Sequence, residues 1–322
     1  MTTALTQFTL INGQVEDSIS VADRGLLYGD GFFTTALIQD SALLNWSAHL
    51  RRLRQSADRL DYPVLDEARL NRDIVKIVEA FTQAFQLAFP SAAQPMLILK
   101  VILTRGSAGR GYAIPEQQQP TLVLQISQAP EAIQSKFIPI SVERSDASKT
   151  TRSGRIKVGI CQTFATIQPQ LAGIKHLNRL ENVLARTEVE QAGWQEGVML
   201  NSLDQVVSGT QSNLFIIKGS QLITPTLDLS GVEGTTRYHL KAIVDSLGLS
   251  WHESDLSMEA VLQADELFFT NALRGVMSVE QLVIRVPKLN EQKSIEYGHI
   301  QTDKINQAWL NALRHNRQKI IA

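Results

Sequence analysis

The sequence predicts a mixed α/β fold in two unequal domains. Its 322 residues exceed the roughly 150 residues of an average domain, which favours two domains over one. Short apolar, β-branched stretches alternate with stretches of helical periodicity, as in mixed α/β proteins. Residues 129–136 show neither pattern and include Pro130, so we expect a linker at 130–136 between domains of residues 1–129 and 137–322.

The N-terminal domain is expected to alternate strands with two helices. Its predicted strands are residues 8–12, 35–39, 42–46, 96–104 and 121–127, with a turn at Asn12-Gly13 and a hairpin at Asp40-Ser41. Ser47 is expected to cap the first helix, and Asp66 the second, which Pro90 stops. Their apolar faces follow spacings of three and four: Leu50, Leu53, Ala57 and Leu60, then Leu70, Ile74, Ile77, Phe81 and Phe85.

The C-terminal domain is expected to hold most of the remaining strands. A helix at residues 177–192 is predicted to turn Leu177, Leu180, Leu184 and Val189 inward and to stop at Gly193. Further helices are expected at residues 238–247, after Ser257 and at 303–319. The predicted strands are residues 137–144, 156–164, 197–200, 206–207, 214–217, 221–224 and 266–269.

Charge and cysteine content exclude several classes of protein. Lys and Arg total 31 against 32 Asp and Glu, so the net charge of −1 argues against a nucleic-acid binder. The single Cys161 permits no internal disulfide and fits a reducing compartment, and the six histidines show no metal-ligand spacing. We expect a cytoplasmic protein, since no secretory signal is seen and the most apolar stretch, 96–103, is too short to span a membrane and contains Lys100.

Residues 229–237 run from a glycine-rich loop into a predicted helix. Free N–H groups at a helix start bind anions, and the hydroxyls of Thr235 and Thr236 add donors, so this segment is a candidate phosphate site. It lacks the Gly-Lys-Ser/Thr of a Walker loop and the dinucleotide fingerprint. The alternative interpretation is a flexible turn in which threonine caps the helix.

Lys175 lies between the apolar residues Ile174 and Leu177. A lysine desolvated in such surroundings has a lowered pKa, which is the condition for Schiff-base chemistry. The alternative interpretation is a solvated lysine at a helix start.

Residues 105–112 place two arginines and three glycines directly after an apolar strand. Arg105 and Arg110 are suited to bind carboxylates with their guanidinium groups. The alternative is a solvated hairpin tip. The turn at residues 24–35 and the adjacent arginines Arg51 and Arg52 on a helix indicate nothing specific by themselves.

In combination and in this order, these motifs resemble the fold-type IV pyridoxal-phosphate enzymes, the group of branched-chain and D-amino-acid aminotransferases. Within that group the chain is most similar to the lyases of folate biosynthesis that convert 4-amino-4-deoxychorismate to 4-aminobenzoate and pyruvate. The resemblance extends from about Leu10 to Leu282. It rests on Asp23-Arg24, Tyr28-Gly-Asp-Gly31, Phe33-Thr-Thr35, His49-Leu-Arg-Arg-Leu53, Thr104–Tyr112, Gly173–Glu181, Ser212-Asn-Leu-Phe215, Gly234-Thr-Thr-Arg237, Ala264-Asp-Glu and Asn271-Ala-Leu273.

The resemblance implies pyridoxal 5'-phosphate as cofactor, in a site between the two domains. Lys175 matches the Schiff-base lysine, which also acts as general base and acid, and Arg52 matches the arginine that contacts the phosphate. Thr235 and Thr236 match the helix start at that phosphate, with Asn271 near the same pocket. Thr34 replaces a transaminase glutamate as in lyases, and Thr35 is implied as a second proton donor. Arg105, Arg110 and Tyr112 fall in the loop implied to meet the substrate carboxylates.

Ser208 departs from the family pattern, because the family usually has a glutamate there that protonates the pyridine nitrogen. A serine leaves that nitrogen largely neutral, which weakens the electron sink that transamination needs. Elimination with aromatisation of the substrate ring tolerates this change better.

The resemblance therefore implies a lyase with a small anionic substrate, no nucleic-acid or membrane partner and a homodimeric assembly. Two alternatives remain: an aminotransferase acting on branched-chain or D-amino acids, and a catalytically idle protein that binds pyridoxal phosphate.

Overall fold

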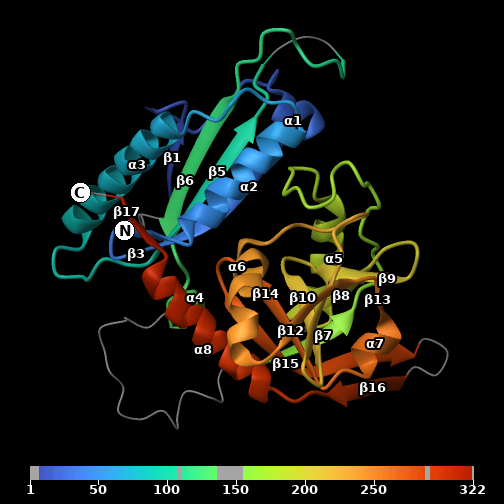
Figure 1. Cartoon of the computed structure of the whole chain (residues 1–322). Helices are drawn as coiled ribbons and strands as arrows, with labels where there is room; N and C mark the ends of the chain where they lie inside the picture. The colour runs from blue at the N-terminus through green and yellow to red at the C-terminus, as the bar shows by residue number, and fades with distance from the viewer. Residues whose placement is uncertain (1–6, 108–110, 136–154, 287–290, 321–322) are drawn as a thin grey trace. The chain divides into compact units, whose positions relative to one another are not determined.

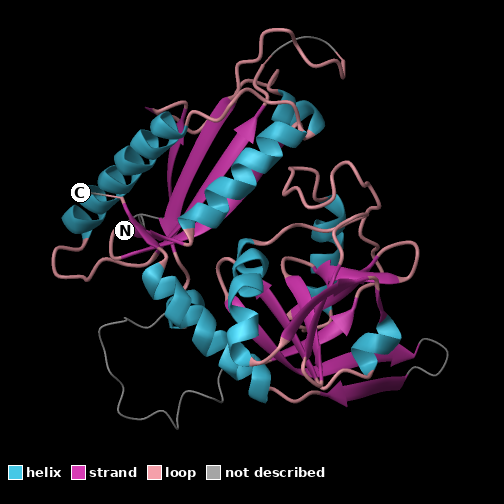
Figure 2. Ribbon diagram, in the orientation of Figure 1, coloured by secondary structure: helices cyan, strands magenta, loops and turns pink. Residues whose placement is uncertain are grey.

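The computed structural model describes residues 7–107, 111–135, 155–286 and 291–320 and divides the chain into two compact units (Figure 1). The first unit comprises Met1–Ile138, Lys175–Asn178 and Leu313–Ala322, and the second comprises Pro139–Ile174 and Arg179–Ala312. Both units combine helices with a sheet, which confirms the mixed α/β, two-domain fold class (Figure 2). Lys175, expected in the C-terminal domain, is assigned to the first unit.

The first unit is built on an antiparallel sheet of seven strands in the order β17-β4-β3-β5-β6-β1-β2. Its elements are β1 (Gln7–Ile11), β2 (Gln14–Val15), α1 (Arg24–Tyr28), β3 (Gly31–Gln39), β4 (Ala42–Leu44), α2 (Trp46–Arg59), α3 (Glu67–Ala88), β5 (Leu97–Thr104), β6 (Thr121–Gln128), α4 (Glu131–Gln134) and β17 (Arg317–Lys319).

Helices α2 and α3 pack on one face of this sheet. Thr34 of β3 contacts His49 of α2, and Phe8 of β1 packs edge-on against Phe81 of α3, with ring centroids 5.7 Å apart. The strand register places Thr34 and Phe8 on the same face, because successive residues of a strand alternate between faces. The other face of β3 therefore carries the side chains of Phe33 and Thr35.

Local sequence signals account for most of the first unit. Asp66 caps α3 by accepting a hydrogen bond from the backbone N–H of Arg69, as expected. Asp40 and Ser41 both have positive φ, which closes the predicted β3–β4 hairpin. The expected cap at Ser47 is wrong: Asn45 is the N-cap residue of α2, and Ser47 lies within the helix.

The second unit contains a ten-stranded sheet in the order β12-β11-β10-β14-β15-β7-β8-β9-β13, with β16 paired to β15. Its elements are β7 (Ile156–Ile160), α5 (Leu180–Gln191), β8 (Glu196–Leu200), β9 (Gln205–Gly209), β10 (Asn213–Lys218), β11 (Gln221–Pro225), α6 (Thr235–Ile243), the 3₁₀ helix η2 (Val244–Leu247), β12 (Ser250–Ser254), β13 (Leu256–Ser257), α7 (Met258–Leu262), β14 (Glu266–Asn271), β15 (Gly275–Val286), β16 (Glu291–Glu296) and α8 (Ile300–His315).

The expected inward face of α5 is wrong. The helix begins at Leu180 rather than at 177, and it buries Ala185 and Val189. Leu180 and Leu184, expected inside, are 77% and 58% exposed. The apolar spacing predicts the helix, but it does not indicate which side chains of the helix are buried within the chain. The strand expected at residues 137–144 lies outside the described residues.

The C-terminal segment ends in a strand instead of continuing the helix expected at 303–319. Helix α8 stops at His315, and β17 then pairs with β4 at the edge of the first unit's sheet. Asn316 accepts a hydrogen bond from the backbone N–H of Asn45 at 2.9 Å and donates its side-chain amide to the Asn45 side chain at 3.0 Å. The segment therefore contacts the N-cap residue of α2.

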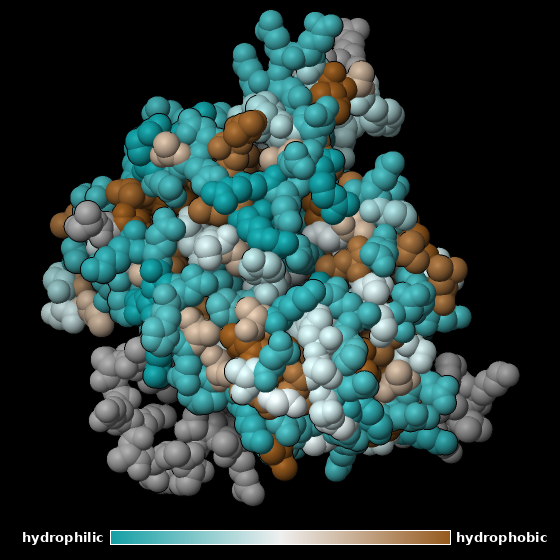
Figure 3. Space-filling model, in the orientation of Figure 1, coloured by the Kyte–Doolittle hydropathy of each residue, from teal (hydrophilic) through white to brown (hydrophobic). Residues whose placement is uncertain are grey.

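In the described parts of the chain, no helix has the length and apolar content of a membrane span. Hydrophilic and hydrophobic residues are intermingled on the face seen in the space-filling view (Figure 3).

Candidate active site

Lys175 lies on a short extended segment that pairs with the outer edge of β3. The N–H of Phe33 donates to the carbonyl of Lys175, and the N–H of Leu177 donates to the carbonyl of Gly31, both at 2.9 Å. Phe32 and His176 form the antiparallel bridge between these bonds. The backbone position of Lys175 is therefore set by strand pairing, and α5 begins five residues later, at Leu180.

Two glycines permit this approach of the Lys175 segment. A Cβ at Gly31 would lie 2.5 Å from the carbonyl oxygen of Leu103 and 2.6 Å from a methyl carbon of Leu177. Gly29 has φ of +66°, and a Cβ there would lie 2.3 Å from Asn178, which donates its side-chain amide to the Gly29 carbonyl. The two glycines of the Tyr28-Gly-Asp-Gly31 motif are thus explained by close packing of this backbone against Leu103, Leu177 and Asn178.

The side chain of Lys175 lies over Phe33, on the face of the sheet opposite to α2 and α3. Its Nζ is 4.5 Å from the centroid of the Phe33 ring, and Nζ of Lys100 is 5.4 Å from the same centroid. Thr35 is the cross-strand partner of Lys100 and shares its face with Phe33. The amino groups of two lysines therefore lie near one aromatic ring, and Thr35 lies on the same face of β3.

Lys100 is a candidate site residue that the motifs did not identify. The available signal was its position as a lysine inside the apolar strand 96–104. A charged side chain is seldom placed in such a strand without a partner or a function.

Arg52 lies on α2 with its guanidinium group buried against β3. Its Nη2 donates to Oγ1 of Thr34, and Oγ1 of Thr34 lies 2.7 Å from Nδ1 of His49. The first unit therefore holds Arg52, Lys175 and Thr35. Arg52 lies on the face of β3 that α2 covers, and the side chains of Lys175 and Thr35 lie on the opposite face.

In the second unit, the N-cap residue of α6 is Gly234, which has no side chain of its own to cap the helix. Gly234 precedes it, and a Cβ there would lie 1.9 Å from the side-chain oxygen of Asn213, so no larger residue fits. Thr235 and Thr236 are buried in the first turn, and Thr236 donates to the carbonyl of Asn271 at 3.1 Å. Such a helix start is suited to bind an anion.

Asn271 and Ser208 have their side chains engaged with the backbone nearby. The side-chain oxygen of Asn271 accepts from the N–H groups of Leu273 and Arg274 at 3.0 and 2.7 Å, which fixes the turn after β14. Ser208 pairs with Met199 of β8 in the strand register and donates to the carbonyl of Gly209 at 2.8 Å.

Glu196 is a buried carboxylate that the sequence motifs did not single out. It accepts hydrogen bonds from the hydroxyls of Thr210 and Ser212 and from the N–H of Thr210. These bonds hold the segment between β9 and β10, which follows Ser208.

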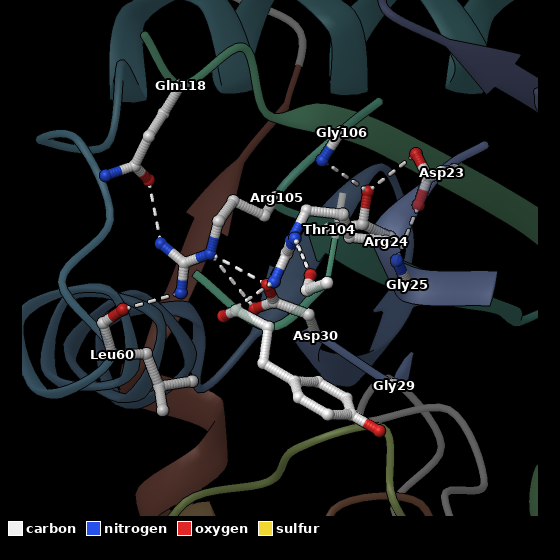
Figure 4. Close-up of polar contacts among 12 residues, drawn as sticks. Asp23, Arg24, Gly25, Gly29, Asp30, Leu60, Thr104, Arg105, Gly106 and Gln118 are labelled. Carbon is white, nitrogen blue, oxygen red and sulfur yellow. Dashed lines mark hydrogen bonds and ion pairs between the residues drawn. The ribbon is translucent and has the colours of Figure 1, made fainter. Parts of the chain in front are cut away.

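Arg105 is buried in a dense network rather than presented to a substrate (Figure 4). Its Nε donates to both oxygens of Asp30, at 2.8 and 3.1 Å, and its terminal nitrogens donate to the carbonyls of Leu60 and Asp61 and to the side chain of Gln118. The guanidinium also stacks over Tyr62, 4.2 Å from the ring centroid. This geometry argues against the carboxylate contact expected for Arg105.

The expected substrate loop also contains Arg110 and Tyr112. Arg110 lies outside the described residues. The Tyr112 ring is exposed and packs edge-on against Tyr28, while Arg24 donates to the carbonyls of Gly111 and Tyr112. Arg24 also pairs with Asp30 at 2.9 Å, so one carboxylate ties the loop to β3.

Comparison with known proteins assigns this arrangement to an enzyme family. Residues 31–282 match the model of the amino-transferase class IV family, which covers more than half of the chain. The chain belongs to this family. Membership confirms the fold-type IV assignment and, with it, pyridoxal 5'-phosphate as the cofactor.

The relatives carry two kinds of activity in their names. The chain is 31% identical to the aminodeoxychorismate lyase of Vibrio harveyi over 84% of this chain and 89% of that one. It is 27% identical to a putative branched-chain-amino-acid aminotransferase of Methanocaldococcus jannaschii, over 86% and 88% respectively. The crystal structure of 4-amino-4-deoxychorismate lyase from Pseudomonas aeruginosa matches with a TM-score of 0.73 and 32% identity, over 96% of this chain and 98% of that one.

Proposed function

We propose that the chain is a pyridoxal-phosphate-dependent lyase that converts 4-amino-4-deoxychorismate to 4-aminobenzoate and pyruvate. The observation that carries the proposal is the placement of the Lys175 amine over Phe33, on the face that also holds Thr35 and Lys100. The relatives from Vibrio harveyi and Pseudomonas aeruginosa, both at 31–32% identity over most of the chain, support this activity.

The residues present fit the cofactor. Lys175 supplies an amine held by strand pairing, and Arg52 supplies a buried guanidinium for the phosphate. We assign the α6 start, with Thr235 and Thr236, to the same phosphate, because a helix start with two threonines buried in its first turn is suited to bind an anion. Asn271 supports that helix start through Thr236, and Ser208 is assigned to the cofactor ring as a neutral partner.

Bound pyridoxal phosphate supplies the electron sink for bond breaking at the substrate carbon that bears the amine. Lys175 acts as the general base that removes the proton from this carbon. The electron pair released forms the aromatic ring as the bond to the enolpyruvyl ether oxygen breaks. Lys175, or the hydroxyl of Thr35, then donates the proton that converts the leaving enolpyruvate into pyruvate, so atoms and charge balance.

Lys100 is assigned to a carboxylate of the substrate, which has two. Its ammonium lies near the same ring as the Lys175 amine, and Thr35 lies beside it. This role takes the place of the one expected for Arg105, whose donors are engaged with Asp30 and backbone carbonyls.

The protein loaded with cofactor is expected to release 4-aminobenzoate and pyruvate in equal amounts from 4-amino-4-deoxychorismate. Lys100→Met is expected to raise KM by roughly 10- to 100-fold, the range for a lost charge-assisted hydrogen bond, with kcat changed less. Product chromatography and a coupled pyruvate assay measure both. Lys157→Met, at an exposed position on β7, is the control and should match the wild type.

Amino-group exchange between amino acids and 2-oxo acids, without formation of 4-aminobenzoate, would overturn the lyase in favour of an aminotransferase. That second candidate is favoured by the relatives named as aminotransferases. An unchanged KM in Lys100→Met would remove Lys100 from the substrate site while leaving the reaction in place.

We infer a homodimer in a reducing, cytoplasmic compartment. Leu180, Val183 and Leu184 form an exposed apolar face of α5, at spacings of three and four residues, and a second copy of the chain is the proposed partner. Burial raises the pKa of the single Cys161 to about 12, which makes its thiol unreactive.

Wild-type protein is expected to elute as a dimer in size-exclusion chromatography with light scattering. Leu180→Glu with Leu184→Glu should halve the measured mass, because two charges would be buried at the interface. Val64→Glu, at another exposed hydrophobic position, should remain a dimer. A double variant that stays dimeric would place the interface elsewhere.

A further inference from the structure

Three polar side chains are buried together between β3 and α2, where apolar residues are expected. Thr34, His49 and Arg52 are at most 7% exposed, and Ala36 and Val101, on the same face of the sheet, are fully buried. Burial of polar groups is unfavourable unless they bond to one another. Arg52 follows His49 by three residues on α2, so the two side chains lie on the same face of the helix and both face β3.

The donors and acceptors of this cluster give it a direction. A guanidinium group only donates, so Nη2 of Arg52 donates to Oγ1 of Thr34. We assign the proton of the Thr34 hydroxyl to the bond with Nδ1 of His49, 2.7 Å away, so that Nδ1 accepts it. His49 is therefore neutral, with its proton on Nε2.

The surroundings of His49 hold it in that state. Burial, with a smaller contribution from the charge of Arg52, lowers the pKa of His49 well below its ordinary value of 6.5. Its ring also stacks on Trp46, the first residue of α2, with centroids 5.9 Å apart and planes inclined by 23°. The acceptor at Nδ1 is thus fixed both in protonation and in position.

We infer that Thr34 and His49 are positioning residues that orient Arg52 toward a phosphate group through a hydrogen-bond chain that carries no negative charge. A carboxylate at position 34 would also bind the guanidinium, but it would neutralise the charge that attracts a phosphate dianion. A hydroxyl backed by a neutral imidazole fixes the orientation and adds no negative charge beside the guanidinium group. This inference rests on the proposed function, because the phosphate is that of the cofactor.

Binding of pyridoxal 5'-phosphate and of pyridoxal, which lacks the phosphate, to the apoprotein tests the inference. Thr34→Val is nearly isosteric and removes the hydroxyl, so it should weaken binding of pyridoxal phosphate about 10-fold or more, the range for a charge-assisted hydrogen bond. Its affinity for pyridoxal should stay within about twofold of the wild type. Thr34→Ser restores the hydroxyl and should restore the ratio of the two affinities.

Two further variants separate positioning from folding. His49→Phe keeps the stacking on Trp46 but cannot accept a hydrogen bond, so the same ratio should fall by a smaller amount, roughly threefold. Thr224→Val removes a buried strand hydroxyl that bonds the carbonyl of Leu214 in the second unit, and it should change neither affinity. Fluorescence titration of the apoprotein measures every variant, with thermal unfolding recorded in parallel.

If Thr34→Val and His49→Phe lose equal affinity for pyridoxal phosphate and for pyridoxal, the role is purely structural and the inference is overturned. Wild-type affinities in both variants would also overturn it. Should Thr34→Val fail to fold, the His49→Phe ratio decides alone. If the ratio of the affinities for pyridoxal phosphate and pyridoxal falls as expected but the protein forms no 4-aminobenzoate, the inference is upheld and the proposed function fails.

Discussion

Lys175→Ala is expected to lose the visible absorption band of the bound cofactor and at least about 1,000-fold of the lyase turnover. The amine serves as the covalent attachment point and as the general base, and general acid–base catalysis alone contributes roughly 100- to 10,000-fold. Lys175 is held at β3 by backbone hydrogen bonds of its own carbonyl and of the Leu177 N–H, which do not depend on its side chain. The fold should therefore survive the substitution.

Absorbance spectra before and after borohydride reduction, together with the assay of 4-aminobenzoate, measure this effect. Lys175→Arg keeps the charge but cannot form the covalent bond, so it should resemble the alanine variant. Exogenous methylamine should restore part of the turnover of Lys175→Ala, because it supplies a base where the side chain was removed. A variant that keeps both the absorption band and its turnover would exclude Lys175 from the active site.

The helices and strands that local sequence predicts correctly are those whose cause is local. Asp66 caps α3 because its own side chain reaches the N–H of Arg69, and the five apolar residues predicted to face inward on that helix are all buried. The hairpin at Asp40-Ser41 likewise follows from two residues with positive φ. Such elements need no information from distant parts of the chain.

Elements that depend on distant partners were not predicted. Local sequence predicts Ser47 as the cap of α2, but Asn45 is the N-cap residue, and its side chain is bound by Asn316, 271 residues further along the chain. The strand β17 forms by pairing with β4 at the edge of the sheet. The helical periodicity of residues 303–319 gives no indication that the helix ends before this strand. Leu180 and Leu184 follow the helical period although the chain leaves them exposed.

The same division applies to the candidate site. The Lys175 motif and the helix start at Thr235 are contiguous in sequence, and both were singled out from it. The network around Arg105 joins Asp30, Leu60 and Gln118, so no stretch of sequence displays it. An arginine in a glycine-rich loop is compatible with either a substrate contact or a structural one, and only the position of Asp30 separates the two.

Asp30→Asn is expected to lower the free energy of unfolding by about 3–5 kcal/mol, because it leaves two buried guanidinium groups without their counter-charge. Arg24 and Arg105, whose side chains are each 4% exposed, meet on the Oδ2 atom of Asp30 at 2.9 and 2.8 Å. The melting temperature should fall by roughly 10 °C. Arg105→Met should cost less, since Asp30 then still pairs with Arg24, and the double variant should be more stable than Asp30→Asn alone.

The dependence of this loss on pH provides the decisive comparison. Burial opposes ionisation of Asp30, but hydrogen bonds from Arg105 and Arg24 and their charges outweigh it, so the pKa of Asp30 lies below its ordinary value of 3.8. The stabilisation from its ionised form is therefore complete above the unfolded value and is lost as the pH falls through the folded value. The difference in melting temperature between wild type and Asp30→Asn should be constant near neutral pH and should shrink below about pH 4. A difference that stays constant down to pH 3 would mean that the loss comes from packing and not from the two ion pairs.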